Sequence, residues 1–231
     1  MHPSIKHLQH HALTHPEETG YVAESGELTY SQLLGLVQSI AQTMRLAGIK
    51  PGQVVASTVH NDLAWPMALA FFHEGVIGTH LGNGSLRPGQ EVEWELTDST
   101  NPRSNGSGNI IVLSQRIADP TTATSFIQPH PMNSMDDLAW ISYTSGTTGS
   151  PKAVGFTIAE LHHTPIRAEW EPSAENPQMS FYGIATSVGV KQAMLALSNK
   201  FPVILLSPLS AKIADVVPRF GVEILAGSPI Q

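Results

Sequence analysis

The chain has 231 residues, with 41% hydrophobic and 13% charged side chains and a formal net charge of −7 at pH 7. This length and composition can build a buried core, and the lack of any Lys- or Arg-rich run excludes an electrostatic case for nucleic acid or an anionic membrane. The chain has no cysteine, which excludes a disulfide framework, thiol catalysis and cysteine-ligated zinc.

The N-terminal segment and the most apolar stretch indicate the cellular location of the protein. Residues 1–18 lack the apolar core of a signal peptide. Residues 63–78 form the most apolar helix-length stretch, but they include Pro66, His73 and Glu74 and are too short and too polar to span a bilayer. We therefore expect a cytoplasmic protein without a membrane span.

Helix and strand signals alternate through the first half of the chain. Thr29 and Gln32 have the spacing of a capping box, apolar residues recur every three or four positions after them, and Gly48 can end that helix. The expected elements are a helix at 28–48, a strand at 54–59, a helix capped by Asn61 or Asp62 that runs to about Gly75, a strand at 76–81, a short helix at 89–99 and a strand at 109–114.

The second half of the chain continues this alternation. Thr157 and Glu160 form another capping box, and Pro218 disturbs the last expected helix. The expected elements are strands at 138–143 and 152–157, helices at 158–163 and 188–199, a strand at 202–207, a helix at 211–221 and a strand at 222–227.

Short apolar strands that alternate with helices predict an α/β fold with mainly parallel sheets flanked by helices. We divide it into a first lobe at residues 1–137 and a second lobe at 138–231. Ligands of such sheets bind at the carboxyl ends of strands. The strand at 138–143 ends where the polar segment 144–152 begins, so this segment is the first candidate for a ligand site.

The segment YTSGTTGSPKA, residues 143–153, combines two glycines, several hydroxyls and a lysine. Glycines let backbone amides approach an anion, hydroxyls donate hydrogen bonds to phosphate oxygens, and lysine adds a positive charge. The P-loop pattern and the dinucleotide-binding glycine pattern both fail here. The residue types alone support a phosphate-binding loop and an ordinary Ser/Thr/Gly turn about equally.

The segment YTSGTTGSPK resembles the phosphate-loop signature of the adenylate-forming superfamily, which includes acyl- and aryl-CoA synthetases, luciferases and peptide-synthetase adenylation domains. Residues 28–56, 61–81 and 211–230 also resemble the family's N-terminal elements in the family's order, and the likeness is weakest at 100–137. The resemblance implies that the phosphates of ATP are held by Thr144, Ser145, Gly146, Thr147, Thr148, Gly149 and Lys152.

The same resemblance implies an AMP-forming ligase. Members of the family join a small carboxylic acid to AMP, using ATP with Mg²⁺, and then pass the acyl group to a thiol such as that of coenzyme A or a phosphopantetheine arm. The segments that carry the family's catalytic and metal-binding residues have no counterpart in residues 1–231. We therefore expect the chain to be part of the N-terminal domain of a longer enzyme, with the rest of that domain and the C-terminal domain absent, and to be inactive by itself.

The chain departs from the family pattern at several positions. Ala153 stands where the family usually has glycine, and Lys200 and Phe201 replace glycines expected before the next strand. The family often has a histidine or aromatic residue near the acyl pocket, in the segment matching residues 181–189. The candidates for that role are Phe181, Tyr182 and Thr186.

Other interpretations of the sequence stay open. The chain can be a non-catalytic relative that binds a nucleotide or a partner, or an unrelated α/β interaction domain with a chance match. Four histidines crowd near the N-terminus, His7, His10, His11 and His15, and the i, i+4 spacings of His7/His11 and His11/His15 could bind a metal on a helix. No carboxylate completes such a site, and chain termini are often mobile, so we expect no metal there. For Glu91, Glu93 and Glu95 we expect a solvated face rather than acid/base catalysis.

Overall fold

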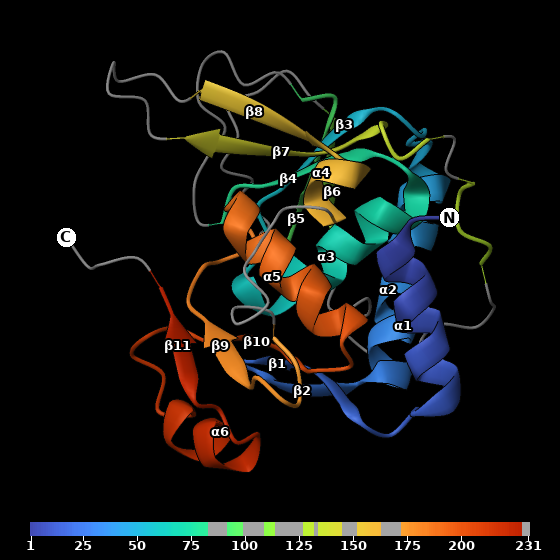
Figure 1. Ribbon diagram of the computed structural model, residues 1–231. Helices are drawn as coiled ribbons and strands as arrows, with labels where there is room; N and C mark the ends of the chain where they lie inside the picture. Colours follow the sequence, from blue (N-terminus) through green and yellow to red (C-terminus); the bar gives the residue numbers. More distant parts are fainter. Residues whose placement is uncertain are drawn as a thin grey trace.

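A computed structural model describes residues 1–82, 92–98, 109–113, 127–131, 134–144, 152–162 and 172–227 (Figure 1). Its helices are α1 (Pro3–Thr14), α2 (Tyr30–Ala47), α3 (Asn61–Glu74), α4 (Ile158–His162), α5 (Ser187–Ser198) and α6 (Ile213–Arg219). Its strands are β1 (Thr19–Ala23), β2 (Gly26–Thr29), β3 (Val54–Ser57), β4 (Ile77–His80), β5 (Trp94–Thr97), β6 (Asn109–Val112), β7 (Leu138–Thr144), β8 (Lys152–Thr157), β9 (Gln178–Ser180), β10 (Val203–Leu205) and β11 (Ile224–Ala226).

The largest sheet has six strands in the order β6-β5-β3-β4-β7-β8. Five of these strands run parallel, and β8 runs antiparallel to β7 as the second arm of a hairpin. The carboxyl ends of β3, β4, β5, β6 and β7 therefore lie along one edge of the sheet. This arrangement confirms the predicted α/β fold with mainly parallel pairing.

Two smaller sheets form the other side of the molecule, in the orders β10-β1-β2 and β11-β9. Strand β1 pairs in parallel with β10, which lies far along the sequence, and antiparallel with β2. Figure 1 shows helices between the six-stranded sheet and the β10-β1-β2 sheet, with α6 beside β11. Helix α3 is buried on all sides from Ala64 to Glu74, as expected for a helix enclosed in such a layer. Trp65, Phe71 and Phe72 are at most 3% exposed, which confirms their predicted place in the core.

The capping signals in the sequence predict three helix ends well. Thr29 accepts a hydrogen bond from the Gln32 amide while the Gln32 side chain accepts one from the Thr29 amide, and Gly48 ends α2 with a φ of 89°. Thr157 and Glu160 exchange the same pair of bonds at the start of α4. These caps depend only on neighbours three residues apart, so the local sequence is enough to specify them.

The short helix expected at 89–99 is wrong, because residues Trp94–Thr97 form strand β5 between β3 and β6. The solvated face expected for the glutamates is wrong at Glu95, which is 1% exposed and accepts a hydrogen bond from the Thr58 hydroxyl at 2.7 Å. Glu93 is exposed as expected, and Glu91 lies outside the described residues. Pairing on both sides of β5 overrides the helical preference of its Glu and Leu residues.

Other local predictions need correction. The cap of α3 is His60 rather than Asn61 or Asp62, since its ring accepts from the Asp62 amide at 3.4 Å. Helix α1, the β1–β2 hairpin and β9 were not predicted from the sequence. Ile5 and Leu8 give α1 only a narrow apolar stripe among its histidines, so its helical period is weak.

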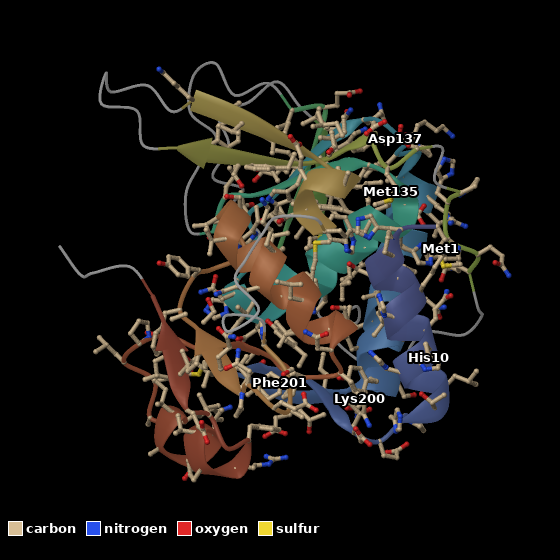
Figure 2. All side chains as sticks on the ribbon, viewed as in Figure 1. Met1, His10, Met135, Asp137, Lys200 and Phe201 are labelled. Atoms are coloured by element: carbon tan, nitrogen blue, oxygen red, sulfur yellow. The ribbon has the colours of Figure 1, made fainter. Side chains whose placement is uncertain are left out.

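The departures at Ala153 and Lys200 have different structural consequences. Ala153 is an exposed residue of β8 paired with Tyr143, and its φ is not positive. Lys200 has a φ of 56°, in the left-handed region that favours glycine. It lies beside buried Phe201 in the turn between α5 and β10 (Figure 2). The turn therefore has the left-handed backbone conformation typical of glycine, although the residue there is a lysine.

Candidate functional site

The predicted phosphate loop is mounted on the β7–β8 hairpin. Thr144 ends β7, Lys152 begins β8, and the two residues pair across the hairpin. Lys152 is exposed, whereas predicted site residues Ser145, Gly146, Thr147, Thr148 and Gly149 lie outside the described residues. Both ends of the segment therefore lie at the edge of the sheet where parallel strands end, which is where ligands of such folds bind.

A buried pair of polar side chains lies at the same edge. Ser57 and His80 are the last residues of β3 and β4 and are paired in register. The Ser57 hydroxyl and His80 Nδ1 are 2.8 Å apart, and the two residues are 0% and 3% exposed. This hydrogen bond orients the imidazole ring within the sheet.

The environment of His80 keeps its ring neutral. Burial disfavours the imidazolium more strongly than Ser57 and the charge of Asp98 favour it, and the pKa of His80 is lowered from 6.5 to about 4. His80 Nε2 is buried and has no hydrogen-bond partner. The hydroxyl of Ser142 in β7, a residue 6% exposed, is also buried without a partner. Such unsatisfied buried groups are uncommon in native proteins.

The neighbouring position of each strand brings a second polar group into the sheet. Thr79 of β4 and Glu95 of β5 both pair with Ala56 of β3, and all three are at most 1% exposed. Glu95 Oε1 accepts from the Thr58 hydroxyl, while Glu95 Oε2 and the Thr79 hydroxyl have no partner. Buried polar residues therefore occupy positions on successive residues near the carboxyl edge of this sheet.

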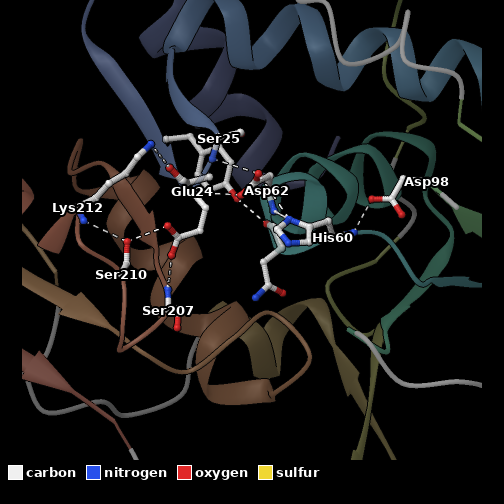
Figure 3. A network of polar contacts seen from close by, with 11 residues as sticks. Glu24, Ser25, His60, Asp62, Asp98, Ser207, Ser210 and Lys212 are labelled. Carbon is white, nitrogen blue, oxygen red and sulfur yellow. Dashed lines mark hydrogen bonds and ion pairs between the residues drawn. The ribbon is translucent and has the colours of Figure 1, made fainter.

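A chain of polar contacts joins this edge to the β10-β1-β2 sheet (Figure 3). Glu24, just after β1, accepts hydrogen bonds from the Ser207 amide at 2.9 Å and the Ser210 hydroxyl at 2.8 Å. These bonds lower the pKa of Glu24. The amides of Glu24 and Ser25 in turn donate to the two carboxylate oxygens of Asp62 at the start of α3, at 3.0 and 3.1 Å. The ends of strands from two sheets are thus tied together.

A cavity of about 390 Å³ lies beside these contacts, between the β1–β2 turn and the start of α3. Its lining includes Tyr21, Leu28, Asp62 and Asp98. Asp62 already accepts two backbone N–H bonds, and Asp98 accepts one from the His60 amide at 2.7 Å. These carboxylates therefore fix loops around the cavity. A second cavity, of about 290 Å³, lies at the opposite edge near Ile77, Leu138 and His130.

The residues expected near an acyl pocket lie between β9 and α5. Phe181 and Tyr182 are half-buried, and the Thr186 hydroxyl accepts from the Gly189 amide at 3.0 Å as the cap of α5. Gly189 packs so closely on the backbone of Gly183 that a Cβ would lie 2.2 Å from its carbonyl oxygen. The role of Thr186 in the described structure is therefore to start α5 at a tight crossing.

Among the four N-terminal histidines, His11 takes part in helix packing. His11 is buried, and its Nε2 contacts the Leu197 carbonyl oxygen at 2.8 Å, which joins α1 to α5. In the described parts of the chain, no group of three or more His, Asp or Glu side chains is arranged to hold a metal ion. Likewise, none of the helices described is long and apolar enough to cross a membrane.

Sequence reasoning missed the buried polar residues of the sheet. Ser57 and His80 end short apolar runs, and Glu95 lies between the apolar residues Trp94 and Leu96. A polar residue beside apolar strand residues is the available signal in each case. A polar residue at such a position indicates a place near the carboxyl edge of a strand. It does not reveal that Ser57 and His80 are neighbours, because that also depends on the order of the strands in the sheet.

Comparison with known proteins gives consistent matches. A family model described as AMP-binding enzyme matches residues 83–230. The chain is 29% identical over 157 residues to 2-succinylbenzoate–CoA ligase from Geobacillus sp. (strain WCH70), covering 64% of this chain and 31% of that ligase. It is 28% identical over 153 residues to tyrocidine synthase 3 from Brevibacillus parabrevis, covering 62% of this chain and 2% of that protein. The chain thus spans a third or less of these relatives.

Solved structures show the same fold. Fatty acid AMP ligase from Legionella pneumophila superposes with a TM-score of 0.76 at 19% identity, covering 99% of this chain and 44% of that one. The o-succinylbenzoate CoA synthetase of Bacillus subtilis gives a TM-score of 0.75 at 18% identity, covering 95% of this chain and 47% of that one. At these identities the likeness concerns the fold.

Proposed function

Because this chain belongs to the AMP-binding enzyme family, that of the adenylate-forming enzymes, we propose that it forms part of an ATP-dependent, AMP-forming ligase that activates a small carboxylic acid and transfers it to a thiol. The chain spans 31% of the first relative described above, so the proposal concerns the whole enzyme of which these residues would be one part. The observation that carries it is the family's phosphate-loop sequence between the paired ends of β7 and β8.

We assign the β- and γ-phosphates of ATP and the departing pyrophosphate to Thr144, Ser145, Gly146, Thr147, Thr148, Gly149 and Lys152. Support comes from the pairing of Thr144 with Lys152, which returns the chain to the same edge of the sheet after the loop. The lysine ammonium can offset phosphate charge, and glycines allow close approach of backbone amides.

The first chemical step is attack of a carboxylate oxygen on the α-phosphorus of ATP. The bond from that phosphorus to the bridging oxygen breaks, so pyrophosphate leaves with the electron pair and an acyl-adenylate remains. Groups that hold the phosphates before reaction need no reorganisation as charge develops on the leaving group. In the second step a thiol attacks the acyl carbon and AMP leaves.

Magnesium fits this scheme as a companion of the nucleotide. Asp62 and Asp98 at the carboxyl edge accept hydrogen bonds from backbone amides, and the described residues contain no three-ligand metal cluster. Mg²⁺ prefers oxygen ligands and often binds through substrate phosphates and water. When bound, it would neutralise phosphate charge. The residues of this chain would position the phosphates.

We propose coenzyme A as the acceptor thiol, because one relative is a CoA ligase. A phosphopantetheine arm is the competing acceptor, because another relative is a peptide synthase. Release of a CoA thioester by the full-length enzyme supports the first choice. Acyl transfer only to a carrier protein contradicts it.

The phosphate assignment can be tested by calorimetric titration of the 231-residue protein with magnesium pyrophosphate. We expect Lys152→Ala to weaken binding by roughly ten- to a hundredfold, because a hydrogen bond to a charged group contributes about 1.5–3 kcal/mol. Lys6→Ala is the matched control, since Lys6 is an exposed lysine on α1.

Unchanged affinity in Lys152→Ala, or no binding by the unaltered protein, overturns the assignment. ATP–pyrophosphate exchange is measured on the same samples. We expect no turnover from this chain alone, so sustained exchange would refute the expectation that other parts of the enzyme are required.

A further inference from the structure

The cavity of about 290 Å³ lies at the amino edge of the six-stranded sheet. Ile77 and Leu138, the first residues of β4 and β7, line it together with Ala139. Phe72 of α3 and Ile158 of α4 contribute further apolar side chains. Cavities that bind small molecules are mostly apolar in the same way, because burial of the ligand's apolar surface drives binding.

One wall of this cavity is the segment 127–131, which is tied to the end of α3. The His130 amide donates to the His73 carbonyl oxygen at 2.8 Å, and His73 Nε2 contacts the Ile127 carbonyl oxygen at 3.2 Å. The His130 ring packs directly on Gly75, where an added Cβ would lie 2.9 Å from its Cδ2 atom. The wall is therefore fixed before any ligand binds, which lowers the entropic cost of binding.

Two stacked rings form another part of the lining. The His2 ring lies parallel to the Phe72 ring, with 3° between their planes and 4.1 Å between their centroids, and both residues line the cavity. His2 is 4% exposed, and burial, together with the nearby His162 and the N-terminal ammonium group, lowers its pKa well below 6.5. The pair is therefore uncharged at neutral pH, and aromatic ligands pack well against such rings.

The lining provides no evident partner for an anion. Its described residues include neither Lys nor Arg. The amides of Gly52, Ile77 and Ile158 already donate to backbone carbonyl oxygens at 2.8, 2.9 and 3.0 Å. Pro51 and Pro131 have no amide hydrogen to donate. A phosphate or carboxylate would lose its water here without receiving hydrogen bonds in exchange.

A cation is also disfavoured. Asp137 is the acidic residue of the described lining, and it takes part in the turn before β7. Its Oδ2 accepts from the Ser134 amide at 2.9 Å, and its backbone carbonyl accepts from the Ile158 amide at 3.0 Å. Transfer of an ammonium group from water to a mostly apolar cavity is costly. The lining therefore suits an uncharged ligand best.

We propose that this cavity is a binding site for a small uncharged aromatic molecule, which packs against His2 and Phe72 at the amino ends of β4 and β7. A volume of about 290 Å³ is near the lower end of the roughly 300–1,000 Å³ of ligand pockets, so it suits a one-ring compound rather than a peptide. Leu138 begins β7 and Thr144 ends it, so this site and the phosphate loop lie at opposite ends of one strand. The inference therefore goes beyond the proposed function and does not depend on it.

The test is isoleucine methyl NMR of the 231-residue protein during titration with benzyl alcohol. We expect saturable shifts of the methyl signals of Ile77 and Ile158, which line the cavity. The signals of Ile213 on α6 and Ile224 on β11 should stay in place, because these residues lie outside the cavity lining. Each signal is assigned by its loss in the corresponding Ile→Val variant.

Two charged compounds with the same ring test the chemical class of the ligand. Benzylamine carries a positive charge at neutral pH, and benzoate carries a negative one. We expect both to bind at least about tenfold more weakly than benzyl alcohol, because burial of a charge opposes binding. If either one shifts the Ile77 and Ile158 signals with the affinity of benzyl alcohol, the assignment of an uncharged ligand is wrong.

A variant that fills the cavity provides the second measurement. Ala139 is 5% exposed and lines the cavity, so the larger side chain of Ala139→Leu would occupy the ligand's space. We expect this variant to lose the benzyl alcohol shifts. Ala47→Leu, at the exposed end of α2, is the matched control and should keep them. Thermal unfolding verifies that each variant is folded, and the methyl shifts of the unaltered protein decide the question if Ala139→Leu is not.

The outcomes separate this inference from the proposed function. Absence of saturable shifts at Ile77 and Ile158 refutes it. Shifts confined to Ile184, between β9 and α5, refute it as well, because they would place the ligand near the residues expected at an acyl pocket. If the protein binds benzyl alcohol in this cavity but binds no magnesium pyrophosphate, the phosphate assignment fails while this inference stands.

Discussion

The two edges of the six-stranded sheet differ in how completely their buried polar side chains are hydrogen-bonded. At the amino edge, where α3 ends, Glu74 receives two hydrogen bonds from the Arg45 guanidinium, at 2.6 and 2.9 Å, and contacts His73 Nδ1 at 2.7 Å. His73 Nε2 faces the Ile127 carbonyl at 3.2 Å. Burial opposes ionisation of Glu74, but the bonds from His73 and Arg45 outweigh it and lower the pKa of this carboxyl group.

At the carboxyl edge, similar residues are left incomplete. His80 has one partner for its two nitrogens, Glu95 has one for its two oxygens, and the hydroxyls of Thr79 and Ser142 have none. Buried polar groups therefore serve two different purposes in this sheet. At the amino edge a complete hydrogen-bond network joins helices and a loop segment, whereas at the carboxyl edge several buried polar atoms lack partners beside a candidate ligand loop.

The largest expected effect is at the closed network. Glu74→Ala leaves Arg45 and His73 without their carboxylate. Removal of one partner from a fully buried ion pair costs about 3–5 kcal/mol, and because the Arg45 side chain is 38% exposed and partly screened by solvent, we expect a cost near the lower end of this range. Urea denaturation measures the change in the free energy of unfolding. Glu74→Gln, which keeps the size and one acceptor oxygen, serves as control and should be less damaging. A loss below about 1 kcal/mol in Glu74→Ala would mean that the amino edge is not locked as described.

The pH dependence of stability tests the incomplete edge. His80 takes up a proton at pH 6.5 when unfolded but only at about 4 when folded, because burial outweighs the influence of Ser57 and of Asp98. Protonation therefore favours unfolding as the pH falls. The contribution is fully present above pH 6.5 and is lost down to about pH 4, by roughly 3 kcal/mol at 1.36 kcal/mol per pKa unit.

His80→Gln keeps hydrogen-bonding groups but cannot titrate, so it isolates this contribution from those of the other buried histidines. Denaturant unfolding of both proteins between pH 4 and pH 7 measures the difference in their free energies of unfolding. We expect the free energy of unfolding of the unaltered protein to fall more steeply than that of His80→Gln as the pH is lowered. Parallel pH profiles for the two proteins would show that His80 does not carry the effect.

The smallest expected effect concerns Lys200, which lies outside both edges of the sheet and gives a reference value for a purely local change. Lys200 has a φ of 56° and makes a surface ion pair with Glu18 at 3.2 Å. Lys200→Gly and Lys200→Ala both remove that ion pair, but only glycine relieves the left-handed backbone, which costs other residues about 1–2 kcal/mol. We expect the glycine variant to be more stable than the alanine variant by about 1 kcal/mol in thermal unfolding. Equal stabilities would indicate a relaxed turn at this position.

Local sequence predicted the parts of the fold that depend on near neighbours. The caps at Thr29 and Thr157, the stop at Gly48 and the apolar strands at 54–59 and 138–143 all involve interactions within a few residues. The prediction failed at Trp94–Thr97, where pairing with β3 and β6 decides the conformation. The segment 144–152 was singled out because its continuous sequence resembles a family signature, and phosphate binding there stays a prediction.

The sequence by itself determined the class of fold, the main helices and the position of the candidate phosphate loop, because periodicity, caps and motifs are written in adjacent residues. Only the tertiary structure decided that β1 pairs with β10 and that β4 lies between β3 and β7. That strand order brings Ser57 and His80 together at the carboxyl edge of the sheet. Contacts between distant segments depend on how strands close against each other, which no local pattern encodes.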